Sequence, residues 1–221
     1  MTPAAGLLRA LLYVVTGVPA FILLWLLLAR IVRAVYRFPM PHFMASVIDN
    51  PLRRVIQPPE EMALRHGVEP GMKVLEVGPG SGTYTVAAAR RVGDEGQVVA
   101  IDIEPKMVER VERRAQAEGV TNIEARVADV YDLPFDAETF DAIYLMSVVG
   151  EIPKPAMALQ EFQRVLSPTG TLAFSELLVD PDYTRSSTLI EMAGKAGLQP
   201  TSKSGNLFHY TLVFEKGSQL A

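Results

Sequence analysis

The sequence predicts an α/β fold with a doubly wound, mainly parallel sheet, preceded by a long apolar helix at the N-terminus. From residue 72 to residue 198, short apolar runs rich in strand-forming residues alternate with helical patterns of ten or more residues. This alternation is typical of strand–helix–strand units. The last two apolar runs, 198–203 and 207–215, are separated only by Ser-Gly-Asn, which predicts a terminal hairpin.

A glycine-rich turn follows the first predicted strand, in the run Val-Leu-Glu-Val-Gly-Pro-Gly-Ser-Gly-Thr at residues 74–83. Glycines at alternate positions allow a sharp turn and the close approach of a ligand to the backbone. Residues 84–91 should form a helix whose free N–H groups face this turn. A dinucleotide-binding turn has its third glycine five residues after the first, where Thr83 stands here. An ordinary tight strand-to-helix turn is the structural alternative.

Acidic residues follow two further predicted strands. The apolar run 97–102 ends at Asp102, where a carboxylate can accept both ribose hydroxyls of a nucleoside. Pro105 then begins a helical pattern, and the strand predicted at 122–127 leads to Asp129. Ligands of parallel sheets bind at the carboxyl ends of the strands. The glycine turn, both acids and residues 146–149, after the strand predicted at 140–145, should therefore border one crevice.

The order of these segments resembles a known family. The turn, with Glu76 two residues before its first glycine, resembles motif I of class I S-adenosylmethionine-dependent methyltransferases. The segments Asp-Val-Tyr-Asp-Leu-Pro-Phe at 129–135, Phe-Asp at 140–141 and Arg-Val-Leu-Ser-Pro-Thr-Gly at 164–170 resemble blocks of the ubiquinone/menaquinone-biosynthesis (type 11) methyltransferases. The resemblance covers about residues 57–216. It implies a Rossmann-like methyltransferase fold with seven strands, an antiparallel terminal strand, and S-adenosyl-L-methionine as cofactor.

The resemblance also implies which residues bind the cofactor. The glycines should line its methionine and ribose, Glu76 should orient the turn or meet the amino group through water, and the two acids should hold the ribose and the adenine edge. The full set is Glu76, Gly78, Gly80, Gly82, Asp102, Ile103, Asp129, Val130 and Met146. A helix cap or a solvated turn carboxylate is the alternative for each acid.

The acceptor half of the crevice is less defined by the sequence. The family's reaction is an in-line displacement, in which positioning alone contributes much of the rate, so a strong base is not required. Glu151, Tyr183 and His209 are the candidate catalytic residues, with Glu176 as a further polar group. His209, between two aromatic residues, can instead be a packed strand residue. Three scattered histidines predict no metal site.

Residues 10–29 contain no charged side chain. Twenty helical residues span about 30 Å, the thickness of the hydrocarbon core of a bilayer. A membrane anchor is favoured over a signal peptide, because the apolar run exceeds 7–15 residues and no small-residue cleavage site follows it. A helix buried in a dimer is a further alternative. Three arginines follow the span and one precedes it, which predicts a single-pass protein with a cytoplasmic catalytic domain.

Charge and prolines divide the chain into an anchor with a basic collar (1–37), a linker (38–56), a methyltransferase domain (57–216) and a tail (217–221). Residues 1–54 carry six arginines against one aspartate, whereas the rest carries 15 basic and 24 acidic residues. The acidic domain is a poor match for the phosphate backbone of a nucleic acid, so no nucleic-acid partner is predicted. An apolar stripe at 43–48, continued at 52–56, predicts a segment lying on the membrane. A helix covering the catalytic domain is the alternative, and residues 57–65 should form the next helix.

The residue types and segments that the sequence lacks argue against several classes of methyl acceptor. The chain has no cysteine, which argues against thiolate nucleophiles, cytosine-C5 methylation and thiol-dependent arsenic methylation. Residues 146–151 differ from the signature of enzymes that methylate base amino groups. Only 23 residues, 175–197, separate the fifth strand from the end of the next helix, so no inserted lid is predicted. The N-terminal segment and a lipid bilayer are then the available covers for the acceptor.

The sequence therefore predicts methyl transfer to a membrane-associated, lipid-like acceptor, either a phospholipid head-group amine or a quinone precursor. Transfer to a soluble small molecule and a methyltransferase-like binding module without catalysis are the alternatives. A nicotinamide oxidoreductase is disfavoured by Thr83 and by the terminal hairpin. The oligomeric state is not determined by the sequence.

Overall fold

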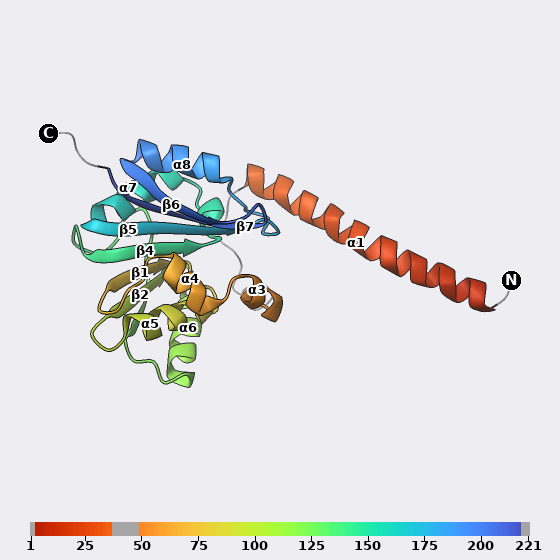
Figure 1. Ribbon diagram of the computed structural model, residues 1–221, viewed down its shortest axis with the longest axis horizontal. Coiled ribbons are helices and arrows are strands. Elements are labelled where there is room, and N and C mark those ends of the chain that lie inside the picture. Colours follow the sequence, from red (N-terminus) through yellow and green to blue (C-terminus); the bar gives the residue numbers. More distant parts are fainter. Residues whose placement is uncertain (1–2, 37–48, 218–221) are drawn as a thin grey trace.

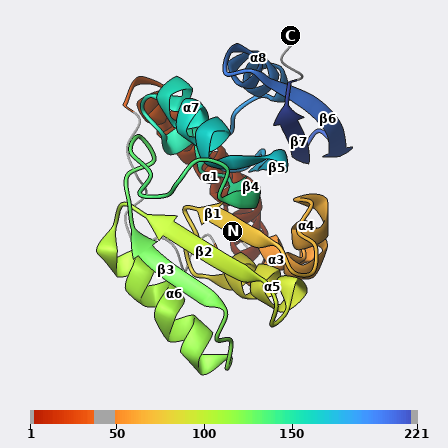
Figure 2. The same cartoon turned by 90° about the vertical axis from the view of Figure 1, so that its left-hand side faces the viewer.

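The computed structural model of the chain describes residues 3–36 and 49–217 (Figure 1). A single seven-stranded sheet has the order β3-β2-β1-β4-β5-β7-β6, and Figure 2 shows these strands side by side. The strands are β1 (Lys73–Val77), β2 (Gln97–Asp102), β3 (Ile123–Val127), β4 (Phe140–Met146), β5 (Leu166–Leu177), β6 (Leu198–Gly205) and β7 (His209–Lys216).

The first five strands are parallel to one another, and β7 runs antiparallel to both β5 and β6. The predicted α/β fold with a mainly parallel sheet and an antiparallel terminal hairpin is confirmed. The hairpin turn has the expected length but lies two residues later than the predicted Ser-Gly-Asn, at residues 206–208, where the side-chain oxygen of Asn206 accepts hydrogen bonds from the N–H groups of Phe208 and His209. Strand β7 therefore begins at His209 and not at residue 207.

Helices cover both faces of the sheet, and the sheet separates the core into two buried clusters. The helices of the domain are α3 (Pro51–Ile56), α4 (Pro59–Arg65), α5 (Thr83–Val92), α6 (Pro105–Ala117), α7 (Pro155–Val165) and α8 (Ser186–Lys195). One buried cluster unites Leu75, Ile143 and Phe174 with α7 and α8, and the other unites Val74, Tyr144 and Ala173 with α4 and α5. Successive strand residues thus enter opposite clusters, as the alternation of side chains along a strand requires.

Two short helices, one in the linker and one directly after it, precede the first strand. Helix α3 starts at Pro51, and the side chain of Asn50 caps it by accepting a hydrogen bond from the N–H of Arg53. Helix α4 begins at Pro59, two residues later than the helix predicted over 57–65, because proline disfavours a helical conformation in the preceding residue. The prolines thus separate the two helices, as the sequence predicted.

Helix α1 (Pro3–Val35) projects from the domain (Figure 1). It contains a 22-residue segment, Leu12–Arg33, with a mean hydropathy of 2.3. The large apolar side chains that the structure describes in this segment are exposed, whereas Arg33 at its end is buried against the domain. By length and composition this segment can cross a membrane. A core helix of similar composition would be mostly buried. The apolar stripe predicted at 43–48 lies outside the described residues.

Arginines attach the end of α1 to the domain. The guanidinium of Arg33 lies 2.5 Å from Asp182 and 3.3 Å from Glu151. The guanidinium of Arg30 donates to the carbonyl oxygens of Leu178 and Asp180. The apolar helix therefore ends directly on the loop that follows β5.

A second set of polar contacts attaches the linker to the glycine turn. Asp49 accepts two hydrogen bonds from Arg54, at 2.8 and 2.7 Å, and further ones from the hydroxyls of Ser81 and Thr83. The guanidinium of Arg114 on α6 lies 3.6 Å from the same carboxylate. Burial alone would raise the pKa of the Asp49 carboxyl, but the hydrogen bonds from Arg54, Ser81 and Thr83 outweigh it and lower that pKa to about 2.

The Asp49 contacts predict a loss of stability in acid. A carboxylate with a lowered pKa stabilises the fold above about pH 4, and this contribution is lost as the pH falls towards 2. The substitution Asp49→Asn should lower the free energy of unfolding at pH 7 by on the order of 1–2 kcal/mol. The difference from the unsubstituted chain should shrink below pH 4. Urea unfolding of the full chain in detergent, followed by circular dichroism, measures both effects.

The control is Asp94→Asn, which neutralises an exposed carboxylate that makes none of these contacts. It should leave the free energy of unfolding within a few tenths of a kcal/mol of the unsubstituted chain. Equal pH profiles for the two variants would contradict the role assigned to Asp49.

Candidate functional site

The principal pocket lies at the carboxyl ends of the parallel strands. Its lining divides into a half around the glycine turn and a half beneath the N-terminal segment. The first half contains Glu76, Val77, Gly78, Pro79, Gly80, Ser81, Ile101, Asp102, Ile103, Met107, Ala128, Asp129, Val130 and Tyr131. The second contains Asp49, Arg53, Tyr84, Met146, Ser147, Val148, Glu151, Ile152, Pro153, Asp180 and Asp182. The crevice expected from the strand ends is therefore present.

The glycine turn has the backbone conformation that only glycine adopts without strain. The φ angles of Gly78, Gly80 and Gly82 are +70°, +56° and +79°. A Cβ on Gly78 would lie 2.6 Å from a methyl carbon of Val148, whereas a Cβ on Gly80 would have no atom within 4 Å. Gly80 therefore leaves open space for a ligand. Gly82 faces Val111 and Arg114 of α6 and does not line the pocket, so its part is to begin α5.

Glu76 is a buried acid at the end of β1. Burial raises the pKa of its carboxyl to about 7, although the hydroxyls of Thr85 and Tyr144 lower it in part. Its Oε2 atom is buried and accepts no hydrogen bond from the described residues. A cationic amino group at this position would supply the missing donor and favour the charged carboxylate.

Asp102 and Ile103 line the opposite wall, at the end of β2. The Asp102 carboxylate accepts a hydrogen bond from the N–H of Glu104 at 2.9 Å, and burial raises its pKa to about 6. Because Asp102 lines the pocket, hydroxyl donors of a ligand there would stabilise its charged form. Ile103 is 53% exposed, an apolar surface suited to a flat ring.

Asp129 and Val130 lie beyond the end of β3. The Asp129 side chain is exposed and accepts a hydrogen bond from the N–H of Tyr131 at 2.9 Å. This contact fits the turn-carboxylate alternative, and it leaves the other carboxylate oxygen available to a ligand. The hydroxyl of Tyr131 accepts from the N–H of Lys154, which joins this wall to the segment that follows Glu151.

The second half of the pocket contains charged residues that the sequence did not single out. Arg53, with only 6% of its surface exposed, donates to Ser147 at 2.8 Å and to both oxygens of Asp180. Ser147 has a φ of +55°, an uncommon conformation for a residue with a side chain, and such strain clusters at functional sites. Asp49 and Asp182 complete the set. Only Asn-Pro at residues 50–51, a helix-start signal, marked this region in the sequence.

The candidate catalytic residues lie in different surroundings. Glu151 lines the pocket and pairs with Arg33 of α1. Tyr183 packs edge-on against Tyr210, with ring centroids 5.9 Å apart, and His209 is half-buried on β7. Neither of them is in the pocket lining of the described residues. Glu176 is buried beside the N–H of Thr184, and burial raises its pKa well above the ordinary value.

The residues present fit S-adenosylmethionine. Gly78 and Gly80 offer backbone that a nucleoside can approach, Asp102 offers a carboxylate for ribose hydroxyls, and Ile103 an apolar surface for adenine. Glu76 lines the pocket, and the cationic amino group of methionine would balance its orphaned oxygen. Within residues 3–36 and 49–217, no cluster of three or more acidic, histidine or cysteine side chains can hold a metal ion.

The close approach of Gly78 to Val148 predicts that an alanine side chain at position 78 destabilises the fold. Gly78→Ala should lower the melting temperature more than Gly119→Ala, since both residues have a positive φ but only Gly78 faces a neighbour. The extra cost should be about 1–3 kcal/mol, as for overpacked cores. Val148→Ala in the same chain should recover part of it. Equal losses for the two glycines, measured by thermal unfolding, would contradict this contact.

Comparison with known proteins gives one family and several relatives. A methyltransferase domain model matches residues 68–206. The ubiquinone/menaquinone biosynthesis C-methyltransferase of Teredinibacter turnerae is 39% identical over 111 residues, which are 50% of this chain and 45% of that one. The 2-phytyl-1,4-naphtoquinone methyltransferase of Trichormus variabilis is 39% identical over 119 residues, covering 52% and 51%. The chain thus spans about half the length of these relatives.

A solved structure supports the same assignment at the level of the fold. The SAM-dependent methyltransferase from Aquifex aeolicus has a TM-score of 0.74 and 23% sequence identity, covering 80% of this chain and 98% of that one. The matched family model includes the glycine turn, both acids at the strand ends and most of the sheet. The chain belongs to the methyltransferase domain family, whose class I members use S-adenosylmethionine as cofactor.

Proposed function

We propose that this protein transfers a methyl group from S-adenosylmethionine to a lipid-like acceptor that reaches the pocket from a membrane. We assign the half of the pocket around the glycine turn to the cofactor and call it the cofactor half. The second half, beneath the N-terminal segment, is the acceptor half. The observation that carries this proposal is the position of the acceptor half. Its acids Glu151 and Asp182 are paired with Arg33 at the end of the apolar helix α1. The acceptor half is therefore next to the one segment of the described chain that can cross a bilayer.

Bound S-adenosylmethionine would supply an electrophilic methyl group on its sulfonium. The chain's own contribution is binding and alignment: Asp102 holds the ribose, the turn at Gly78 and Gly80 carries the backbone of the site, and Glu76 balances the amino group. Holding the acceptor atom in line with the methyl group contributes roughly 7–11 kcal/mol, so no strong base is needed for an amine.

Two classes of acceptor remain, and each has its own support. The relatives' names describe methylation in ubiquinone, menaquinone and naphthoquinone biosynthesis, which favours a quinone precursor. A ring carbon requires a phenolate, and Glu151 is the acid in the lining that can act as its base or orienter. The acids of the acceptor half favour an amine, because Glu151, Asp180 and Asp182 outnumber the two arginines that pair with them in the described part of the chain and can attract an ammonium head group. The ammonium must release a proton before its nitrogen attacks the methyl group, and Glu151 in the lining can take that proton. In both cases α1 anchors the chain as a single pass and the domain is cytoplasmic.

The ribose contact predicts how cofactor binding depends on pH. Asp102→Asn removes the charge that accepts the hydroxyls, so the affinity for S-adenosylmethionine should fall about tenfold or more. In the unsubstituted chain the affinity should fall below pH 6, because protonation of Asp102 removes the same charge. The variant should lack this dependence near pH 6. Calorimetry on the full chain in detergent measures both.

Two comparisons isolate Asp102. Glu109→Gln changes an exposed acid on α6 outside the pocket and should leave affinity unchanged. Glu76→Gln changes the other acid with a raised pKa in the pocket, and it should preserve the transition near pH 6. Unaltered affinity in Asp102→Asn would contradict the ribose contact.

The acceptor is identified by incubating the full chain in detergent with radiolabelled S-adenosylmethionine and a total lipid extract. Label should enter the organic phase with the unsubstituted chain and not with Asp102→Asn. Chromatography then separates a methylated head-group amine from a methylated prenyl ring. Cofactor binding without label in any lipid would contradict the lipid acceptor and favour a soluble one or a binding module.

A further inference from the structure

The domain has an exposed apolar surface built from three segments that are far apart in sequence. We call it the apolar face; it consists of Leu52, Val55 and Ile56 of α3, Val179 after β5, and Leu207 and Phe208 in the β6–β7 turn. The exposed fractions are 68% for Leu52, 76% for Val55, 58% for Val179, 76% for Leu207 and 65% for Phe208. Large side chains this exposed cost little singly, but as a contiguous patch they mark an interaction site.

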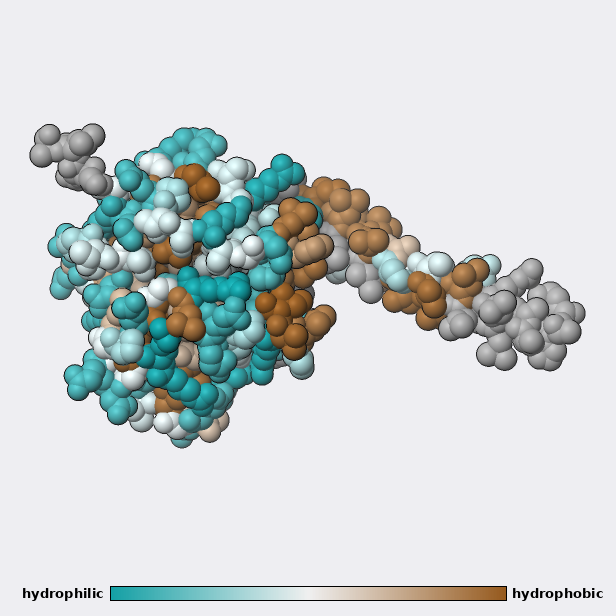
Figure 3. All heavy atoms as spheres, viewed as in Figure 1, coloured by the Kyte–Doolittle hydropathy of each residue, from teal (hydrophilic) through white to brown (hydrophobic). Residues whose placement is uncertain are grey.

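Hydrogen bonds tie these segments to one another. The N–H of Leu178 donates to the carbonyl of Phe208 at 2.7 Å, so the hairpin turn lies beside Val179. Arg53, between the exposed residues of α3, pairs with Asp180 at 3.2 Å. The three segments are therefore neighbours in space. Figure 3 shows apolar side chains gathered on this side of the domain.

The same contacts include the end of α1. Arg30 donates to the carbonyl of Leu178, the residue whose N–H binds Phe208. The apolar segment that ends at Arg33 has 22 residues, a rise of about 33 Å for a bilayer core of about 30 Å. If this segment spans a bilayer, its end lies at the head groups, and so does the apolar face. Figure 1 shows α1 leaving the domain on the side of α3 and the hairpin tip.

The apolar face also borders the pocket. Arg53 and Asp180, which line its acceptor half, are chain neighbours of Leu52 and Val179. Helix α3 thus turns its arginine inwards and its leucine and valine outwards. The sequence left two interpretations of residues 52–56, a segment lying on the membrane and a helix covering the catalytic domain. The two are compatible, because the outer side of α3 is free to contact lipid while its inner side covers the pocket.

We propose that the catalytic domain docks on the lipid bilayer through the apolar face, so that the acceptor half of the pocket opens at the head-group level. The face takes a lipid surface as its partner because it continues an apolar helix of membrane-spanning length. This inference rests on the membrane location of α1 in the proposed function, and it adds that the domain itself contacts lipid.

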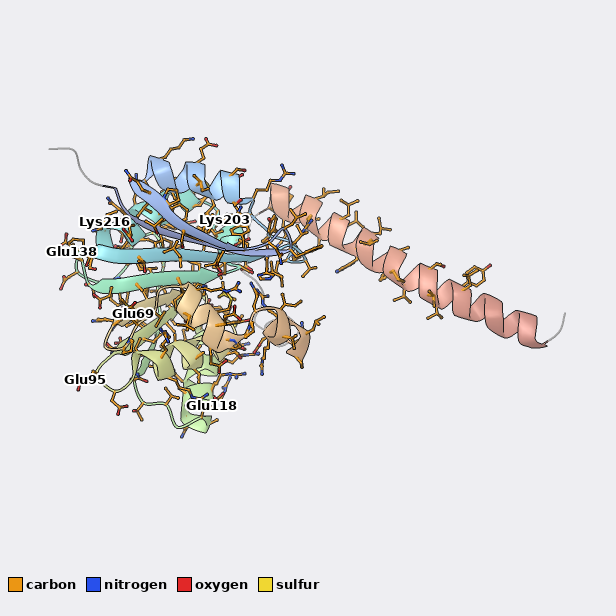
Figure 4. The ribbon with its side chains drawn as sticks, viewed as in Figure 1. Glu69, Glu95, Glu118, Glu138, Lys203 and Lys216 are labelled. Atoms are coloured by element: carbon orange, nitrogen blue, oxygen red, sulfur yellow. The ribbon has the colours of Figure 1, made fainter. Side chains whose placement is uncertain are left out.

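The chain contains no cysteine, so single substitutions give unique labelling sites. Val55→Cys, Val179→Cys and Leu207→Cys are each spin-labelled in the full chain, reconstituted into vesicles of phosphatidylethanolamine and phosphatidylglycerol. Glu95→Cys, exposed on the side of the domain opposite α1, is the matched control (Figure 4). Calorimetry with S-adenosylmethionine verifies that every labelled chain is folded.

Paramagnetic resonance compares collisions of each label with oxygen, which concentrates in lipid, and with a water-soluble nickel chelate. The oxygen-to-nickel ratio should be several-fold higher at residues 55, 179 and 207 than at residue 95. Equal ratios at all four positions in a chain that floats with vesicles would overturn the docking face and leave the membrane anchor intact.

Two other outcomes would overturn the proposal for different reasons. A chain that does not float with the vesicles contradicts both the anchor and the docking face. Alternatively, the labels could be shielded from both reagents and show dipolar broadening between the labels of two chains. That result would show a second copy of the chain on this surface in place of lipid. The measurement requires no methyl transfer, so a failure to methylate lipids leaves it unaffected.

Discussion

The structure depends most on the backbone of the turn between β1 and α5. Its glycines have positive φ angles, and the residue at position 78 lies against Val148 with no room for a Cβ. Strands β1 and β4 are paired in the sheet up to Val77 and Leu145, so their ends are adjacent, and the absence of a Cβ at Gly78 lets Val148 pack directly against the turn. In the proposed function, the turn therefore limits both where the cofactor can approach and how close the acceptor residues lie to it.

The Asp49 carboxylate connects this turn to the N-terminal segment. It binds Ser81 and Thr83 of the turn and Arg54 of α3, while Arg53 on the same short helix reaches Ser147 and Asp180. One six-residue helix thus contacts both halves of the pocket. The outer side of α3 is apolar. A lipid that contacts this side would therefore be separated from the glycine turn only by the helix and its Asp49 and Arg54 contacts.

The acceptor half differs from the cofactor half in how its charges are held. The residues that we propose to bind the cofactor follow individual strands, and each is placed by its own strand end. The acceptor acids are instead held by arginines from outside the sheet, Arg33 from α1 and Arg53 from α3. In the proposed function, the N-terminal segment thereby covers the acceptor of a methyltransferase domain that has no inserted lid between β5 and β6.

The sequence alone predicted the mainly parallel sheet, the succession of strands and helices along the chain, and the glycine turn and acids at the strand ends that line the pocket, because local patterns specify these: apolar periodicity, glycines at fixed spacing, and acids directly after strands. The tertiary structure alone decided the acceptor half. Asp180 and Arg53 are 127 positions apart, and no local pattern records that they meet. For the same reason Tyr183 and His209, polar residues near the predicted crevice, lie outside its lining, since the packing of the last hairpin decides which way they face.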